Sequence, residues 1–185
     1  MSGYPATPCR YAPPDGYGVA YACPQNPGTH PDVTVAIAED QFRTQTYPDQ
    51  GGPCPVCGTP TGAHLAGLAF RLEGRLYLSS HLPVGTIYHY PCWRGLDGTQ
   101  PCHAWDNCPG EHLLVVTPNG RHWDIDGRAS NCTLPQDRTH RCWTRHGDPP
   151  RLTVDKSGPT CSAGTGSIQI GDYHGFLRDG TLTAG

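Results

Sequence analysis

Ten cysteines and ten histidines in a chain of 185 residues constrain the fold more than any other feature of this sequence. The first residues, Met1 to Pro5, have neither the basic nor the apolar segment of a secretion signal, so we expect a reducing compartment. Disulfides are rare in such a compartment, and closely spaced cysteines there more often bind metal. The sequence therefore predicts a protein stapled by metal ions, with zinc as the expected metal.

The composition explains why such staples are needed. The chain has 24 glycines and 20 prolines, and only 36% of its residues are hydrophobic. A core so poor in aliphatic side chains offsets little of the conformational entropy that folding costs, and bound metal is a common remedy. Four tryptophans, nine tyrosines and three phenylalanines still give the chain something to bury, so we expect a folded protein.

Turn signals are frequent along the chain, whereas helical periodicity is absent. Glu73-Gly74, Asn119-Gly120 and Asp179-Gly180 each lie between two short apolar runs, which is the pattern of a β-hairpin. No window keeps a 3.6-residue apolar period with caps at its ends. The sequence predicts a mostly β fold of small antiparallel sheets and hairpins stapled by zinc, with long irregular Pro/Gly-rich segments and little helix. Strands are expected at 33–37, 68–72, 75–79, 86–90, 113–117, 121–125, 151–155, 167–170, 174–178 and 181–183.

Three segments are expected along the chain. Residues 1–32 carry seven prolines and are predicted to form an extended arm rich in proline and tyrosine. Residues 33–95 would form a zinc-knuckle β subdomain, which contains a Gly/Pro-rich linker at 49–53. Residues 96–185 would form a β-hairpin subdomain with cysteines and histidines of its own.

The tightest cysteine cluster is Cys54-Pro55-Val56-Cys57-Gly58, which has the Cys-x2-Cys spacing of a zinc knuckle. Two thiolates on one tight turn supply half of the tetrahedral ligand set that zinc prefers. His64 is the predicted third ligand. Cys92 is predicted as the fourth, with His89 or His81 as alternatives. A pair of free thiols or a disulfide is the other interpretation of the same spacing.

Three looser groups of cysteine and histidine accompany the knuckle. They are the set Cys102, Cys108 and His112, the set Cys132, His140, Cys142 and Cys161, and the set Cys9, Cys23 and His30. The first two are candidates for a second metal site, and the third could tie down the N-terminal segment. Buried free cysteine also behaves as a small hydrophobe, which is the alternative for these residues. We expect one zinc ion in the protein, with two zinc ions as the alternative count.

Other patterns carry less chemistry. In the expected strand at 121–125, period two places His122 and Asp124, together with Asp126, on one face. This face could serve acid–base chemistry or hold a metal, but an ordinary half-buried strand explains it more simply. Basic residues gather between 138 and 151, yet the formal net charge is -3, so we expect no nucleic-acid partner. No apolar run approaches the roughly 20 residues that cross a membrane, so we expect no membrane partner.

A family resemblance covers the second half of the chain. Its residues are Cys108–Pro118, Trp123–Asp126, Gly166–Ile168 and Tyr173–Gly180. In these segments the chain resembles a family of small Cys/His-containing β proteins, of no known activity, that is common in actinobacterial phages and scattered through bacteria. The resemblance implies a Cys-rich turn at the start of a β domain and a Cys/His metal site near its end. Carried onto this sequence, the implied site residues are Cys102, Cys108, Cys161 and His174.

These observations predict a zinc-binding phage protein with a structural or protein-interaction role, as a virion component or an accessory factor. Twelve of its thirteen basic residues are arginine, which is typical of the GC-rich genomes of actinobacteria and their phages. We expect it in the host cytoplasm or the virion, with other virion or host proteins as partners. Tyrosines of the 1–32 arm would provide the contact area. The alternative is a metal-dependent hydrolase with an open metal position near His174. We expect binding rather than catalysis, and no catalytic residue is assigned.

Overall fold

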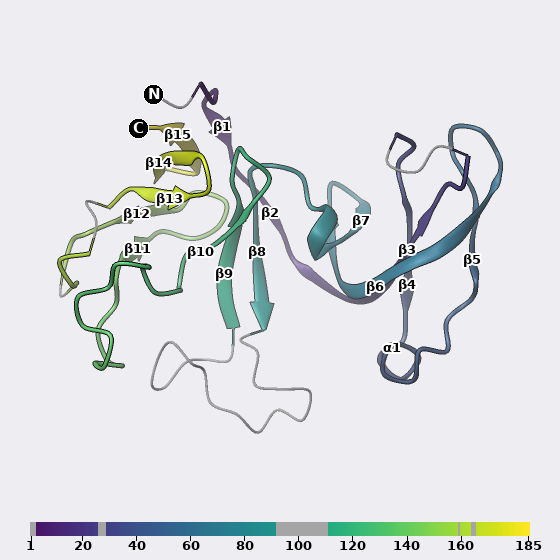
Figure 1. Ribbon diagram of the computed structural model, residues 1–185, viewed down its shortest axis with the longest axis horizontal. Helices are drawn as coiled ribbons and strands as arrows, with labels where there is room; N and C mark the ends of the chain where they lie inside the picture. The colour runs from purple at the N-terminus through teal and green to yellow at the C-terminus, as the bar shows by residue number, and fades with distance from the viewer. Residues whose placement is uncertain (1–2, 26–28, 92–110, 159, 164–165) are drawn as a thin grey trace. The chain divides into compact units, whose positions relative to one another are not determined.

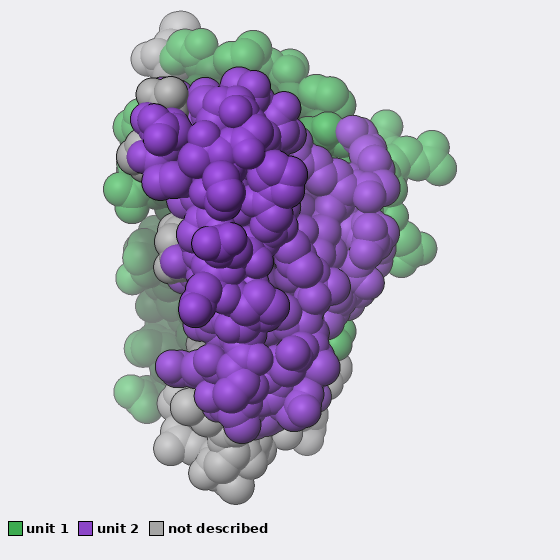
Figure 2. Space-filling model, turned by 90° about the vertical axis from the view of Figure 1, so that its right-hand side faces the viewer, with its two compact units in different colours: residues 1–11, 83–185 green, residues 12–82 purple. Residues whose placement is uncertain are grey.

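The computed structural model describes residues 3–25, 29–91, 111–158, 160–163 and 166–185. The regular secondary structure of these residues is mostly β, in small antiparallel sheets and hairpins (Figure 1), which confirms the predicted β architecture. The chain divides into two compact units. Unit 1 comprises Met1–Tyr11 and Pro83–Gly185, and unit 2 comprises Ala12–Leu82 (Figure 2).

Unit 2 is built around one long strand. β6 (Pro60–Leu72) has 13 residues and pairs with β5 (Gln50–Pro53) at its start, with β3 (Pro14–Ala22) along its middle and with β7 (Arg75–Leu78) at its end. β4 (Val33–Ile37) pairs with the other side of β3. The sheet order is therefore β4-β3-β6-β5, with β7 also beside β6, and all pairs are antiparallel.

Apolar side chains from the middle strands fill unit 2. Val19 and Tyr21 of β3 are fully buried, and Phe70 and Leu78 of β6 and β7 are almost so. The hydroxyl of Tyr21 donates to the carbonyl of Pro48 at 2.8 Å, which satisfies the polar end of this buried side chain. β3 therefore provides the centre of the unit rather than an irregular connection.

Helix is confined to two short segments of the described chain. α1 (Glu39–Thr44) has six residues, and the N–H of Ala38 donates to the side chain of Gln41 at 3.0 Å. A single 3-10 turn, η1 (Ser79–His81), follows β7. Six residues are too few to show an apolar period, which is why the sequence contains no sign of α1. Neither segment has the length and apolar character that a membrane-crossing helix needs.

The described part of unit 1 contains two four-stranded sheets and a separate hairpin. The strands of the first sheet are β1 (Thr7–Pro8), β13 (Ile168–Ile170), β14 (Tyr173–Arg178) and β15 (Thr181–Ala184), in the order β1-β15-β14-β13. The strands of the second are β2 (Arg10–Ala12), β8 (Thr86–Pro91), β9 (Glu111–Val116) and β10 (His122–Asp124), in the order β10-β9-β8-β2. The hairpin consists of β11 (Thr144–His146) and β12 (Thr153–Asp155).

The core of unit 1 joins both sheets and the hairpin. Ile87 and Val115 from the second sheet, Leu177 and Leu182 from the first, and Leu152 beside β12 are all fully buried and belong to one cluster. Because these side chains come from distant parts of the sequence, they hold the two sheets of the unit in one body.

The three expected glycine turns are present, but one differs in type. Both residues of Glu73-Gly74 (φ 50° and 80°) and of Asp179-Gly180 (φ 42° and 69°) have positive φ, as two-residue hairpin loops require. At Asn119-Gly120 only the glycine does, with φ 77°. There the N–H of Thr117 donates to the carbonyl of Arg121 at 2.8 Å, and the N–H of Gly120 donates to the carbonyl of Thr117 at 2.8 Å. This loop therefore has three residues and ends in a left-handed glycine.

The described residues of the first 32 are distributed over both units and do not form a separate arm. β1 pairs with β15, with Thr7 opposite Leu182, while β3 lies between β4 and β6. The tyrosines expected to face a partner serve the fold: Tyr4 donates to Asp172 at 2.7 Å, and Tyr21 is fully buried. The expected linker at 49–53 contains β5. Strand pairing thus divides the chain near residues 11 and 82, instead of near 32 and 95.

Candidate metal centres

Each unit brings three cysteines and one histidine to one point. In unit 2 these residues are Cys23, His30, Cys54 and Cys57, which we name centre A. In unit 1 they are Cys132, His140, Cys142 and Cys161, which we name centre B. The sulfur and ring-nitrogen atoms of each centre all lie within 4.8 Å of one another, so each centre could hold a metal ion.

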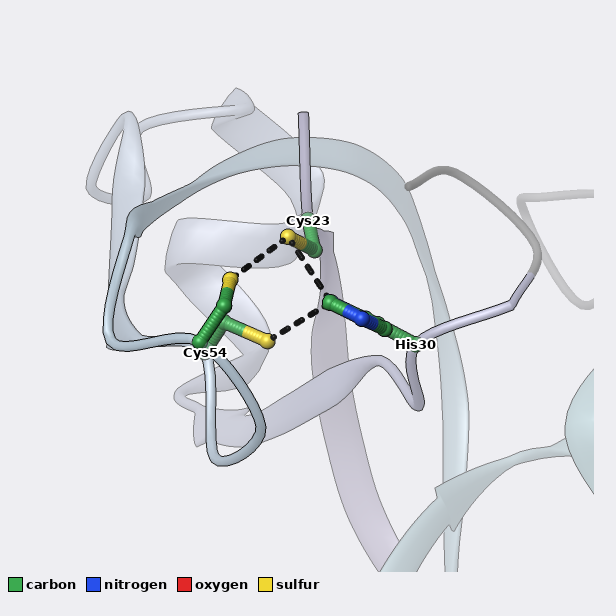
Figure 3. Close-up of side chains that lie close together, drawn as sticks. Cys23, His30 and Cys54 are labelled. Carbon is green, nitrogen blue, oxygen red and sulfur yellow. Dashed lines mark hydrogen bonds between the residues drawn. The ribbon is translucent and has the colours of Figure 1, made fainter. Parts of the chain in front are cut away.

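The ligand atoms of centre A have the spacing of a tetrahedral site. Nδ1 of His30 lies 3.4 Å from Sγ of Cys23 and 3.4 Å from Sγ of Cys54, and Sγ of Cys23 lies 3.5 Å from Sγ of Cys57. Figure 3 shows the side chains of Cys23, His30 and Cys54 pointing toward one another. Metal–sulfur bonds of about 2.3 Å and metal–nitrogen bonds of about 2.0 Å place tetrahedral zinc ligands roughly 3.5–3.8 Å apart.

Two neighbouring connections in the sheet build centre A. Cys54 and Cys57 lie on the turn between β5 and β6, where the N–H of Gly58 donates to the carbonyl of Cys54 at 2.8 Å. Gly58 has φ 74°, which glycine adopts without strain. Cys23 directly follows β3, and His30 precedes β4. Because the last residue of β3 pairs with β6 near its start, the two connections meet at the same end of the sheet.

Centre B has a similar spacing and deeper burial. Nε2 of His140 lies 3.3 Å from Sγ of Cys132 and 3.8 Å from Sγ of Cys142, and Sγ of Cys161 lies 3.7 Å from Sγ of Cys142. Cys142 is fully buried, and Cys161 is 4% exposed, in a small cluster with two alanines. The irregular segment between β10 and β11 supplies three of the ligands, and Cys161 follows β12. Centre B therefore joins the segment between β10 and β11 to the segment after β12, which are otherwise paired by one isolated bridge.

The imidazole of centre B is oriented by a backbone carbonyl. Nδ1 of His140 lies 2.8 Å from the carbonyl oxygen of Asp137. A carbonyl oxygen can only accept, so Nδ1 carries the hydrogen and Nε2 faces the sulfurs with its lone pair. Metal-binding histidines are commonly fixed in this way by a partner on the second nitrogen.

Arg128 braces the loop that carries two ligands of centre B. Its guanidinium donates to the carbonyls of Leu134 and Pro135 at 3.1 Å each and to that of Asp137 at 2.6 Å. The same group lies 3.8 Å from Sγ of Cys132. One side chain thus holds the loop around the site and places a positive charge beside a sulfur ligand.

The local surroundings set the ionisation of three thiols. Hydrogen bonding with the side chain and the backbone of Thr59 lowers the pKa of Cys57 to about 6. Burial opposes ionisation of Cys161, but backbone amides, that of Ala163 first, outweigh it and lower its pKa to about 6. Burial raises the pKa of Cys142 to about 11. Since metal binds the thiolate, a metal ion entering centre B would displace the proton of Cys142, and its affinity there would rise with pH.

Three of the predicted ligands reach a centre, namely Cys54 and Cys57 in centre A and Cys161 in centre B. Cys23 and His30 complete centre A instead of forming a third site with Cys9. Cys9 lies in the core of unit 1, where burial raises its pKa to about 12. The set of Cys132, His140, Cys142 and Cys161, which the sequence grouped as a second metal site, comes together as centre B.

Other predicted ligands lie elsewhere or outside the described residues. Cys92, Cys102 and Cys108 are in the undescribed range 92–110, so metal binding by them stays a prediction. The backbone of His64 lies in β6, and its side chain is outside the described part. His112 is buried, and its Nδ1 lies 2.8 Å from Oδ2 of Asp124.

The remaining histidine candidates belong to neither centre. His174 is exposed on β14, and no group of three ligand residues found in the described chain includes it. His81 pairs with Asp32 at 3.4 Å, and His89 pairs with Glu111 at 3.3 Å. The hydrolytic metal position expected near His174 therefore has no counterpart among the described residues.

The polar face expected at 121–125 is engaged within the fold. Nδ1 of His122 lies 2.5 Å from the hydroxyl oxygen of Tyr88, and burial lowers the pKa of His122. Neutral His122 therefore accepts the hydroxyl hydrogen. Asp124 pairs with His112, and Asp126 accepts a backbone N–H at 2.8 Å. These pairings favour the interpretation as a half-buried strand.

One exposed group has the composition of a catalytic triad without its geometry. Nε2 of His146 lies 3.2 Å from Oδ1 of Asp155 and 2.8 Å from Oγ of Ser157. A proton relay needs the carboxylate and the serine on opposite ring nitrogens, whereas here both contact the same nitrogen. The hydroxyl of Ser157 donates to Oδ1 of Asp155 at 2.6 Å, so the group links β11 to the end of β12 and does not activate the serine.

No protein-family model matches the chain, and no curated protein or solved structure matches it either. The geometry of centres A and B is therefore the basis for a functional assignment.

Replacing Arg128 with methionine is expected to weaken metal binding at centre B alone. Methionine retains a long, flexible side chain but donates no hydrogen bond, so the loop carrying Cys132 and His140 loses its brace. Loss of such outer support typically lowers metal affinity about 10- to 100-fold. Competition with a chelator would measure the effect, with centre A in the same molecule as the control. Unchanged affinity at centre B would contradict the bracing role.

Proposed function

We propose that the protein binds zinc at centres A and B, and that each ion holds one unit in its fold. The observation that supports this most is the convergence of three sulfurs and one ring nitrogen in both units. Magnesium and calcium prefer oxygen ligands, whereas a tetrahedral set of thiolate and imidazole ligands suits zinc.

A structural role for the zinc is supported by the number and placement of the ligands. Four protein ligands complete a tetrahedral ion, whereas a catalytic zinc keeps one position for water or substrate. Centre A joins the β5–β6 turn to the ends of β3 and β4, and centre B fastens the irregular segment between β10 and β11. Such segments have little regular structure of their own, so the metal supplies stability that local hydrogen bonding does not.

Elemental analysis of the purified, reduced protein tests this proposal. We expect about two zinc ions per chain, one for each closed set of four ligands. A count of about three would indicate that the predicted set of Cys102, Cys108 and His112 binds zinc as well. Cobalt in place of zinc should give the intense absorption of tetrahedral, thiolate-bound cobalt. Less than one metal ion per chain, or iron in place of zinc, would contradict the assignment.

We also propose that the zinc-held units bind another protein, as a virion component or an accessory factor of a phage. The family resemblance of the C-terminal half supports a phage origin, and rigid small β units with many loops are suited to presenting contact residues. Affinity capture from infected actinobacterial cells tests this, with the zinc-loaded chain as bait and the chelated chain as control. Capture of the same virion or host proteins by the zinc-loaded chain alone is expected. Equal capture by both baits, or none, would contradict it.

A further inference from the structure

Solvent reaches the sulfur ligands of the two centres to different degrees. Cys57 is exposed, and its neighbour Val56 on the same turn is 61% exposed. The other sulfur ligands are buried or partly buried: Cys23, Cys54, Cys132, Cys142 and Cys161. Among the six ligand cysteines, Cys57 is thus the one that an external reagent meets first.

The charge of a zinc centre keeps such a sulfur nucleophilic. Three thiolates and a neutral imidazole around Zn²⁺ carry a net charge of about minus one, so electron density remains on the sulfurs. In centre B the guanidinium of Arg128, 3.8 Å from Sγ of Cys132, offsets part of this charge. In centre A the N–H of Val56 points to Sγ of the buried Cys54 at 3.5 Å. The exposed sulfur of Cys57 has the hydroxyl of Thr59 at 3.4 Å.

We propose that Cys57 is a modification site for soft carbon electrophiles of the α,β-unsaturated carbonyl class, and that its alkylation releases the zinc of centre A. This inference rests on the proposed zinc binding. A lone pair of the Cys57 sulfur forms a bond to the β-carbon of the electrophile. The π electrons of the alkene move to the α-carbon, which then takes a proton from water, so no group is oxidised or reduced.

The product explains the loss of metal. A thioether is neutral and binds zinc weakly, so the bond between zinc and Cys57 breaks and three protein ligands remain. Because metal binding and folding of small zinc units are coupled, centre A empties and unit 2 opens. Centre B, with no exposed sulfur among its ligands, keeps its zinc under the same conditions.

Reaction of the zinc-loaded full-length chain with limiting N-ethylmaleimide tests the inference. Zinc release is followed with a chromogenic chelator, and adducts are located over time by peptide mass spectrometry. Among the six ligand cysteines, the first adduct is expected at Cys57, with alkylation roughly tenfold faster there than at any other ligand cysteine. One zinc ion should be released at the same rate as this adduct forms. A first adduct at any other ligand cysteine, or release from centre B first, would overturn the inference.

Cys57→His provides the matched variant. Histidine offers a nitrogen ligand in place of the thiolate, so both zinc ions are expected to stay bound while the fast phase of release disappears. A fast phase that persists in a zinc-loaded C57H protein would overturn the inference, and if this variant fails to hold zinc, adduct mapping in the unaltered chain still decides. Total zinc, measured after full denaturation, separates the two proposals. No zinc at all refutes the proposed function, whereas two ions with slow reaction at Cys57 refute only the modification site.

Discussion

Replacing Cys23 with serine is expected to remove one zinc ion per chain and to unfold unit 2, while unit 1 keeps its zinc and its fold. Cys23 is 1% exposed, and its sulfur lies 3.4 Å from Nδ1 of His30 and 3.5 Å from Sγ of Cys57. Serine would leave the ion with three good ligands and a buried hydroxyl. Zinc binding contributes on the order of 10–16 kcal/mol in small zinc-dependent folds. The total stability of a domain is about 5–15 kcal/mol, so losing one ion is enough to unfold a unit of this size.

Tryptophan fluorescence provides a readout that separates the units. All four tryptophans, Trp93, Trp105, Trp123 and Trp143, belong to the sequence range of unit 1, and unit 2 has none. Emission should therefore stay native in Cys23→Ser, while the zinc count falls by about one, the share of one closed site. Cys9→Ser is the matched control, because Cys9 is a buried cysteine outside both centres. A Cys23→Ser protein that keeps all its zinc, or a Cys9→Ser protein that loses as much, would contradict the assignment of centre A.

The strands that the sequence predicted are those with a local signal. β4 occupies Val33–Ile37, the predicted range, because a run rich in β-branched residues suits an extended strand. The sequence predicts irregular chain where β3 lies, since Pro13, Pro14 and two glycines, Gly16 and Gly18, lie in or beside it. Proline is tolerated as the first residue of a strand, which is where Pro14 lies. What makes β3 a central strand is its pairing with β4 and β6, and no local pattern shows such pairing.

In centre A, too, the part that the sequence predicts is the part with a local pattern. The spacing of Cys54 and Cys57 predicts half of the site. The other half is distant in sequence, since His30 is 24 residues from Cys54 and Cys23 is 34 residues from Cys57. Only the antiparallel pairing of β3 with β6 brings these segments together. His64 appeared close in sequence, yet it lies four residues beyond Pro60, where β6 begins. A strand advances about 3.3 Å per residue, so the backbone at His64 is roughly 13 Å beyond that point.

Centre B was predictable as a group because its ligands are close in sequence. Cys132, His140 and Cys142 lie in one loop, and the bridge between Arg141 and Thr160 brings Cys161 to it. The alternative, that these cysteines are small buried hydrophobes, describes part of the same arrangement. Cys142 and Cys161 do pack with alanines, and a metal ligand that is also a core residue explains both observations. The bracing by Arg128 depends on a loop conformation that no spacing rule describes.

Cys142→Ser is expected to produce the reciprocal result, with loss of the zinc of centre B and a red shift of tryptophan emission. Cys142 is fully buried, and its carbonyl accepts a hydrogen bond from Lys156 at 2.5 Å. The next residue, Trp143, packs edge-on against Trp123, with 5.3 Å between the ring centroids. Trp123 belongs to the main core of unit 1, so disorder at centre B reaches that core directly. Unit 2 should retain its zinc, because all four ligands of centre A lie within it. If either single substitution empties both centres, the units do not fold independently, and the zinc ions stabilise one cooperative body instead of two.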